Sequence, residues 1–175
     1  MKIKNQETLE QMYGKILAVL RSSSSTLEEV LTAYKSRAEK EPENAPFIEY
    51  GVERQFHRHV VKAAFKERIA ALLEEAQNFE DAFVIYKAIP KRVSSTVARI
   101  KQWAAQHALG FANCRQALTL YRYAPCGPIG EQALAKASRL AKTQDELWQM
   151  AVHSQVCGNR KLWKQAVKKL AQKLK

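Results

Sequence analysis

The chain repeats one of its own segments, and this repetition constrains its fold more than any other feature of the sequence. The segment "AFVIYKAIP" (82–90) aligns without gaps to "ALTLYRYAP" (117–125), 35 residues later, and the two share Ala, Tyr and Pro at their first, fifth and ninth positions. A third and weaker copy, "LWQMAVHSQ" (147–155), follows 30 residues after the second. Repetition at a period of roughly 20 to 50 residues is typical of chains that stack several copies of one small structural unit.

Each repeated unit is predicted to be a helical hairpin. Apolar residues recur at three- and four-residue spacing, and no segment alternates steadily between apolar and polar residues, which favours helices over strands. Each first helix opens with an N-cap residue followed, three positions later, by a residue that can hydrogen-bond back to it. The four motifs are Thr26-x-x-Glu29, Asn78-x-x-Asp81, Asn113-x-x-Gln116 and Thr143-x-x-Glu146.

These signals predict an all-α fold of stacked antiparallel helical hairpins, a short right-handed α-solenoid with about four hairpin units plus a lead helix. A chain of 175 residues is long enough for one well-buried domain, so residues 1–175 are expected to form a single all-helical domain. Residues 1–77 would hold the lead helix and an elongated first unit. Residues 78–171 would hold three compact hairpin repeats, and residues 172–175 a basic tail.

The repeats resemble the α-solenoid superfamily of helical-hairpin repeats, which includes tetratricopeptide and HEAT repeats, over roughly residues 26–171. This resemblance implies a stack of hairpins with a binding surface, usually for proteins or peptides, and it implies no catalytic residue. No repeat here carries the Trp-x-x-Leu-Gly-x-x-Tyr run of tetratricopeptide repeats, and the spacing shortens from 35 to 30 residues along the chain. No specific repeat family is therefore identified.

Positive charge is concentrated in the second half of the chain. The net charge is +12, yet residues 1–82 contain 12 Lys and Arg against 14 Asp and Glu. Residues 83–175 contain 17 Lys and Arg against only three acidic residues, and every formal side-chain charge after Glu146 is positive. Such an asymmetry indicates a basic face that meets an acidic partner.

The basic residues of the repeats are the best candidates for binding. Lys101 and Lys136 occupy equivalent positions of two second helices, and Lys169 follows Arg139 at the next repeat interval, so stacking would align them as a stripe. Tyr123 replaces an alanine of the previous copy and is predicted to face outward. The candidate partner-binding residues are Arg99, Lys101, Arg122, Tyr123, Lys136, Arg139, Arg160, Lys161, Lys164, Lys168 and Lys169.

The favoured function is a non-catalytic protein-interaction module, or adaptor, that binds an acidic protein partner through its basic C-terminal half. The alternative is sequence-tolerant binding of RNA or DNA through the same basic stripe. The segment "RKLWKQAVKKLAQKLK" (160–175) is also a basic amphipathic helix of the kind that lies on anionic membranes. Its apolar face is expected to close the last hairpin instead, so a membrane partner is not expected. The partner's identity and the oligomeric state stay open.

No motif points to an enzyme, a cofactor or a metal site, and an enzyme is the less favoured class. No Gly-rich phosphate loop is present and no catalytic Ser/His/Asp arrangement stands out, so catalytic, cofactor-binding and metal-binding residues are predicted to be absent. Cys126-Gly127 and Cys157-Gly158 each precede a helix, and we interpret them as two copies of one turn. Stacked turns stand about 10 Å apart, too far for a disulfide.

The remaining expectations concern packing and compartment. Trp103, Trp148 and Trp163 are predicted to fill the space between hairpins, and Cys114 to be a semi-buried structural cysteine. Three cysteines in 175 residues suggest no disulfide framework, and the N-terminal segment is not typical of a cleaved signal peptide. No apolar run reaches the roughly 18 to 20 residues of a membrane span. A reducing, cytoplasmic location is therefore expected.

Overall fold

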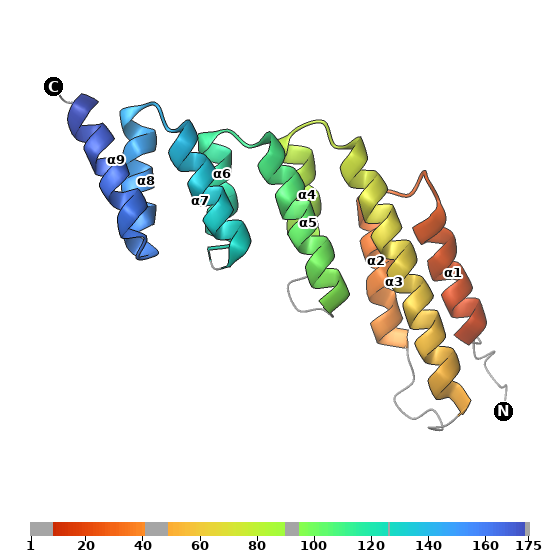
Figure 1. The fold of residues 1–175 in the computed structure, drawn as a ribbon. Helices are drawn as coiled ribbons and strands as arrows, with labels where there is room; N and C mark the ends of the chain where they lie inside the picture. Colours follow the sequence, from red (N-terminus) through yellow and green to blue (C-terminus); the bar gives the residue numbers. More distant parts are fainter. Residues whose placement is uncertain (1–8, 41–48, 90–94, 126, 174–175) are drawn as a thin grey trace. The chain divides into compact units, whose positions relative to one another are not determined.

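The structure, a computed structural model, describes residues 9–40, 49–89, 95–125 and 127–173, and these residues form nine α-helices and no strand (Figure 1). The helices are α1 (Leu9–Arg21), α2 (Leu27–Lys40), α3 (Glu49–Glu75), α4 (Phe79–Ala88), α5 (Ser95–Phe111), α6 (Cys114–Tyr123), α7 (Pro128–Leu140), α8 (Gln144–Val156) and α9 (Arg160–Lys173). The prediction of an all-helical chain is confirmed. The turn at Pro90-Lys91, Cys126 and the last two residues of the basic tail lie outside the described residues.

The predicted N-cap motifs begin the helices as expected. Reciprocal hydrogen bonds join Thr26 with Glu29, Asn113 with Gln116 and Thr143 with Glu146. The fourth motif differs slightly, because Asn78 accepts the Asp81 N–H at 3.0 Å while the Asp81 carboxylate accepts the N–H of Gln77 instead. Each cap satisfies backbone N–H groups that have no partner within the helix, so the sequence motifs set where these helices start.

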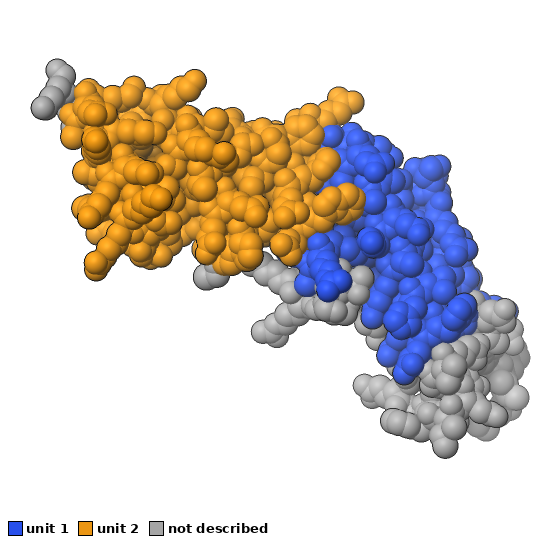
Figure 2. Space-filling view, in the orientation of Figure 1, with its two compact units in different colours: residues 1–76, 87–101 blue, residues 77–86, 102–175 orange. Residues whose placement is uncertain are grey.

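The chain divides into two compact units, which Figure 2 distinguishes by colour. Unit 1 comprises residues 1–76 and 87–101, and unit 2 comprises residues 77–86 and 102–175. Within unit 1, helices α1, α2 and α3 pack against one another in all three pairings. Tyr13, Leu20 and Phe65 are fully buried there, and the ring of Tyr34 stacks on that of Phe65 with centroids 4.1 Å apart.

A buried arginine joins α3 to the serine turn between α1 and α2. Arg68 is only 7% exposed, and its Nη2 donates to the backbone carbonyls of Ser23 at 2.9 Å and Ser25 at 2.7 Å. Its Nη1 lies 3.6 Å from the carboxylate of Glu75. The serine turn at residues 22–25 therefore supplies the backbone carbonyls that accept hydrogen bonds from Arg68.

Unit 2 contains two helical hairpins in direct contact. Helix α6 packs against α7 and α8 packs against α9, and further contacts join α7 to both α8 and α9, and α6 to α8. Leu118, Leu134, Leu147 and Met150 are fully buried in this unit. The wider arrangement of all the hairpins as one repeat stack stays a prediction, as does the single domain.

The two Cys-Gly pairs both lie in hairpin turns but are not copies of one turn, because Gly127 is the N-cap of α7 whereas Gly158 directly follows Cys157, the C-cap of α8. Gly127 lies between α6 and α7 with φ of 91°, and Gly158 lies between α8 and α9 with φ of 71°. Residues with a Cβ rarely adopt these left-handed conformations, so glycine allows both chain reversals.

Candidate functional site

Three lysines of the predicted stripe hydrogen-bond to backbone carbonyls at or near helix C-termini. Lys101 donates to Ile89, Lys136 donates to Leu109 and Gly110, and Lys169 donates to Ser138. Burial, followed by the nearby Arg139 guanidinium, lowers the pKa of Lys136. Carbonyls in the last turn of a helix lack intrahelical partners, so these lysines stabilise helix ends. Lys136 of α7 donates to carbonyls near the end of α5, and Lys169 of α9 donates to a carbonyl near the end of α7. By these hydrogen bonds, Lys169 corresponds to Lys136 more closely than to Arg139. Their role in binding stays a prediction.

Arg122 and Tyr123 also have neighbours on the protein surface. The Nε–H of Arg122 points at Nε2 of His153 at 3.5 Å, and the imidazole meets the ring of Tyr121 edge to face. Burial, followed by the charge of Arg122, lowers the pKa of His153. Tyr123 is 48% exposed, as predicted, although its ring meets that of Phe83 at 5.1 Å.

The other six basic candidates are fully available to a partner. Each is exposed, and in the described part of the chain no carboxylate lies within ion-pair distance of any of them. They are Arg99, Arg139, Arg160, Lys161, Lys164 and Lys168. Four of them lie on α9, and this concentration makes the last hairpin the most cationic feature of unit 2.

An apolar groove runs between α8 and α9. We define the α8–α9 groove by Trp148, Val152 and Gln155 of α8 and Trp163, Val167 and Leu170 of α9. Its volume is about 440 Å³, within the roughly 300 to 1,000 Å³ typical of ligand pockets. The structure thus brings together apolar side chains of α8 and α9 on a face that no described helix covers.

The prediction that the tryptophans fill the space between hairpins is wrong for two of them. Trp148 is 64% exposed and Trp163 is 37% exposed. Leu147 and Met150 take the buried side of α8, and successive helical residues are rotated by about 100°, so Trp148 is turned away from that side. In α9 only Ala166 is buried. The apolar face of α9 is therefore not used up in closing the hairpin.

A row of cations borders the groove. Arg160, Lys164 and Lys168 are spaced four residues apart along α9, so they follow one another on one side of the helix. Trp163 and Val167 each lie one position before a member of this row. We call these three residues the basic row, and it gives the apolar groove a positively charged edge.

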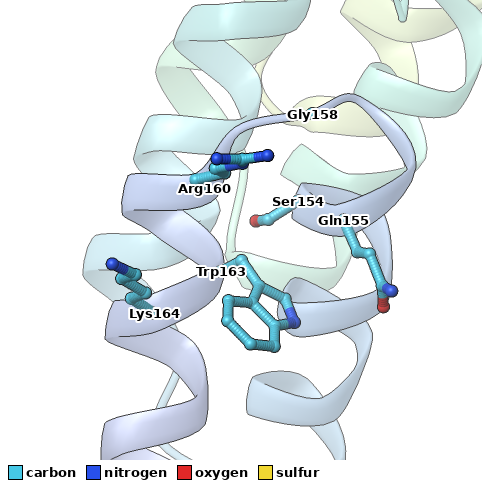
Figure 3. A pocket seen from close by; sticks show the side chains of 6 residues that line it. All are labelled: Ser154, Gln155, Gly158, Arg160, Trp163 and Lys164. Atoms are coloured by element: carbon cyan, nitrogen blue, oxygen red, sulfur yellow. The ribbon is translucent and has the colours of Figure 1, made fainter.

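A second hollow adjoins the groove at the α8–α9 turn. It is lined by Ser154, Gln155, Gly158, Arg160, Trp163 and Lys164, has a volume of about 420 Å³, and is called the Ser154 hollow below. Figure 3 shows Arg160 extending from α9 and the Ser154 hydroxyl extending from α8 toward the space between the helices, while the Lys164 ammonium lies on the side of α9 away from Ser154. Gln155 and Trp163 line both the hollow and the groove.

The sequence analysis singled out the basic row but neither the groove nor Ser154. One signal for the groove was available: Trp148, Val152 and Val156 recur every four residues on α8, beside the stripe that begins at Leu147. A helix with two apolar faces has more apolar surface than one neighbouring helix covers. Nothing local to Ser154 distinguishes it from other helical serines.

Within the described residues, no three His, Cys, Asp or Glu side chains come close enough together to hold a metal ion. Cys114 is buried, and its Sγ–H donates to the carbonyl of Ala137 at 3.5 Å. Burial raises the pKa of the Cys114 thiol to about 11, with a further contribution from Glu146. Cys157 is exposed and forms no disulfide.

The two thiols should differ strongly in reactivity. In a Cys126→Ser background at pH 8, we expect iodoacetamide to modify Cys157 at least about 100-fold faster than Cys114, because only the thiolate reacts and the buried thiol is almost entirely protonated. The Cys114 rate should rise about tenfold per pH unit below its pKa of about 11. Mass spectrometry of timed samples measures both rates, and equal rates would contradict the burial of Cys114.

None of the helices in the described residues combines the length and the apolarity needed to cross a membrane. Comparison of the chain with protein-family models, with curated proteins and with solved structures finds no match. The candidate function therefore depends on the site's own chemistry: an apolar groove, a cationic edge and an adjoining polar hollow.

Proposed function

We propose that the protein is a non-catalytic interaction module, built from stacked helical-hairpin repeats, that binds an acidic amphipathic helix of a partner protein in the α8–α9 groove. The single observation that carries this proposal is the exposed apolar groove beside the basic row. The first feature selects an apolar stripe on the ligand, and the second selects acidic residues next to that stripe.

The groove has the properties of a helix-binding surface. Grooves that bind helices accept apolar side chains spaced at i, i+3, i+4 and i+7 on the ligand. Trp148 and Trp163 stand on the two walls of this groove, and tryptophan is enriched among the residues that contribute most to binding energy at protein interfaces. Two exposed tryptophans on one hairpin are unusual for a surface that has no partner.

The basic row favours an acidic partner over a second copy of the chain. In a two-fold dimer through this groove, the same surface of each copy would face the other. Two rows of Arg160, Lys164 and Lys168 would then approach one another, and like charges repel. A helix with Asp and Glu flanking its apolar stripe would instead meet the row with opposite charge.

Nucleic-acid binding is the second candidate, and the excess of Lys and Arg in residues 83–175 supports it. It uses Arg122, Tyr123 and Arg139 together with the basic row. It leaves the apolar groove without a role, however, since a phosphate backbone gains nothing from Val152, Val167 or Leu170. The acidic helix accounts for both the groove and the row.

Selection from a library of helical peptides about four turns long tests the proposal. We expect the full chain to enrich peptides with an apolar stripe flanked by Asp or Glu. Replacing Trp148 and Trp163 together by alanine should weaken binding of these peptides at least about 100-fold, because both anchors are lost. Trp148 is 64% exposed and Trp163 is 37% exposed, so circular dichroism should show a folded variant whose melting temperature falls mainly through the lost packing of Trp163.

A double variant, Tyr123→Ala with Arg139→Met, provides the control, because it removes residues of the alternative surface and leaves the groove intact. Its peptide affinity should stay within about twofold of the wild type.

Labelled mixed-sequence RNA and DNA are titrated in parallel at about 50 and 200 mM salt. Tight binding with a steep salt dependence that this control variant loses would replace the proposal with nucleic-acid binding. Binding to phosphatidylserine vesicles that requires Trp163, without peptide enrichment, would assign the groove to a membrane surface and also contradict the proposal.

A further inference from the structure

The Ser154 hydroxyl is a buried hydrogen-bonding group that the protein leaves unused. The side chain is 0% exposed, and its Oγ has no hydrogen-bond partner. The backbone carbonyl of Ser154, in contrast, accepts the N–H of Asn159 at 2.8 Å. A buried hydroxyl without a partner is unfavourable, and serines inside helices commonly avoid this by donating to the carbonyl four residues earlier. The position therefore indicates a hydrogen bond that a ligand completes.

The same hollow holds two cations and no anion. Arg160 and Lys164 line it from α9, and no Asp or Glu is among its lining residues. Neither cation has a carboxylate within ion-pair distance in the described part of the chain. A guanidinium offers two parallel N–H donors that match the two oxygens of a carboxylate, and the hydroxyl adds a third donor. The chemistry of the hollow therefore fits a small anion.

The hollow adjoins the groove. Gln155 and Trp163 form part of both surfaces, so a ligand that fills the groove passes the mouth of the hollow. The anion that reaches Ser154 most readily is then a side chain of that same ligand. In a peptide, an anionic side chain is the carboxylate of Asp or Glu.

We propose that the Ser154 hollow is a carboxylate-binding site that receives one Asp or Glu side chain of the partner helix, with Ser154 and Arg160 as its donors. This inference rests on the proposed function of the groove. It makes one acidic residue of the ligand specific in position, whereas Lys164 and Lys168 of the basic row respond only to the ligand's general charge.

Titration of the ¹⁵N-labelled full chain with sodium acetate, at constant ionic strength, tests the hollow without any peptide. We expect saturable NMR shifts of the backbone N–H groups of Gln155 and Gly158 and of the Trp163 indole N–H. Acetamide, which has the same size and no charge, should produce none of them. Shifts spread evenly over the surface lysines, or equal shifts with acetamide, would overturn the proposal.

Two variants identify the donors. Ser154→Ala should weaken acetate binding about tenfold, as expected for losing one hydrogen bond to a charged group. Its melting temperature should stay the same or rise, because no hydrogen bond within the protein is lost. Arg160→Met should weaken acetate binding by a similar factor, whereas Arg139→Met, with the same loss of charge outside the hollow, should not. A folded Ser154→Ala variant with unchanged acetate affinity would overturn the assignment.

A peptide and inorganic phosphate complete the experiment. In a peptide selected for the groove, changing the relevant Glu to Gln should weaken binding about tenfold to the wild type, and clearly less to Ser154→Ala, which retains only the Arg160 donor. Acetate binding without any peptide enrichment would refute the function of the groove but not the carboxylate site. Peptide binding without coupling to Ser154 would refute the carboxylate site alone. Phosphate binding in the hollow more tightly than acetate would overturn the carboxylate assignment in favour of a phosphate-bearing ligand.

Discussion

Replacing Arg68 by methionine should lower the free energy of unfolding of unit 1 by about 3 kcal/mol. Arg68 is buried, and its Nη2 donates to the carbonyls of Ser23 and Ser25. Hydrogen bonds to a charged group contribute about 1.5 to 3 kcal/mol each, and their loss would leave carbonyls of the α1–α2 turn without donors. Methionine retains most of the apolar stem, so the loss reflects the guanidinium. Urea denaturation monitored by amide hydrogen exchange in α2 and α3 measures the change.

Two controls isolate the turn contact. Lys66→Met removes an exposed cation from the same helix and should change stability by less than about 0.5 kcal/mol. Glu75→Gln removes the ion pair with Arg68, but the Glu75 side chain is largely exposed, so its effect should also be small. If Glu75→Gln destabilised unit 1 as much as Arg68→Met, the ion pair rather than the serine turn would be the important contact.

Replacing Gly130 by alanine should destabilise unit 2 by about 2 to 3 kcal/mol. A Cβ at this position would lie 2.3 Å from the carbonyl oxygen of Ala124 and 2.9 Å from that of Pro125. Both oxygens belong to the backbone that ends α6, so a rotamer change cannot relieve the clash. The first turn of α7 would have to move away from α6, which opens the hairpin that carries Leu118 and Leu134 in its core.

Gly14 and Gly110 are the matched controls, since a Cβ at either would meet no atom within 4 Å. Alanine stabilises helices relative to glycine by up to about 1 kcal/mol, so Gly14→Ala in α1 should raise stability and Gly110→Ala at the end of α5 should raise it less. Thermal unfolding of the three variants therefore gives changes of opposite sign. A neutral Gly130→Ala would show that α6 and α7 do not approach as closely as described.

The proposed site and these two stabilising contacts occupy separate places. Arg68 and its serine turn belong to unit 1, and Gly130 holds the α6–α7 hairpin of unit 2. The groove and the hollow lie on α8 and α9. Trp148 is mostly exposed and the Ser154 hydroxyl makes no hydrogen bond within the protein, so variants of either can change binding without the large losses of stability expected for Arg68→Met or Gly130→Ala.

Some of the candidate site could be predicted from the sequence and some could not. The exposed cations Arg160, Lys164 and Lys168 follow from their residue type, because charged side chains without partners stay in water. The carbonyl partners of Lys101, Lys136 and Lys169 could not be predicted from the sequence, because these carbonyls lie 12 to 31 residues away in the chain. The exposure of Trp148 is the opposite of what its residue type suggests, since it depends on where neighbouring helices pack.

The sequence by itself determined the helical content, the starts of the capped helices and the two hairpin turns at Gly127 and Gly158. These features depend on interactions within about four residues of chain, such as a Thr143 hydroxyl and an N–H three positions later, and such interactions can be read from neighbouring letters. Only the tertiary structure decided which face of each helix is covered. It placed Arg68 against the serine turn, left Trp163 beside an open groove, and buried Ser154 without a partner. These outcomes depend on contacts between residues distant in the chain, and no local pattern specifies them.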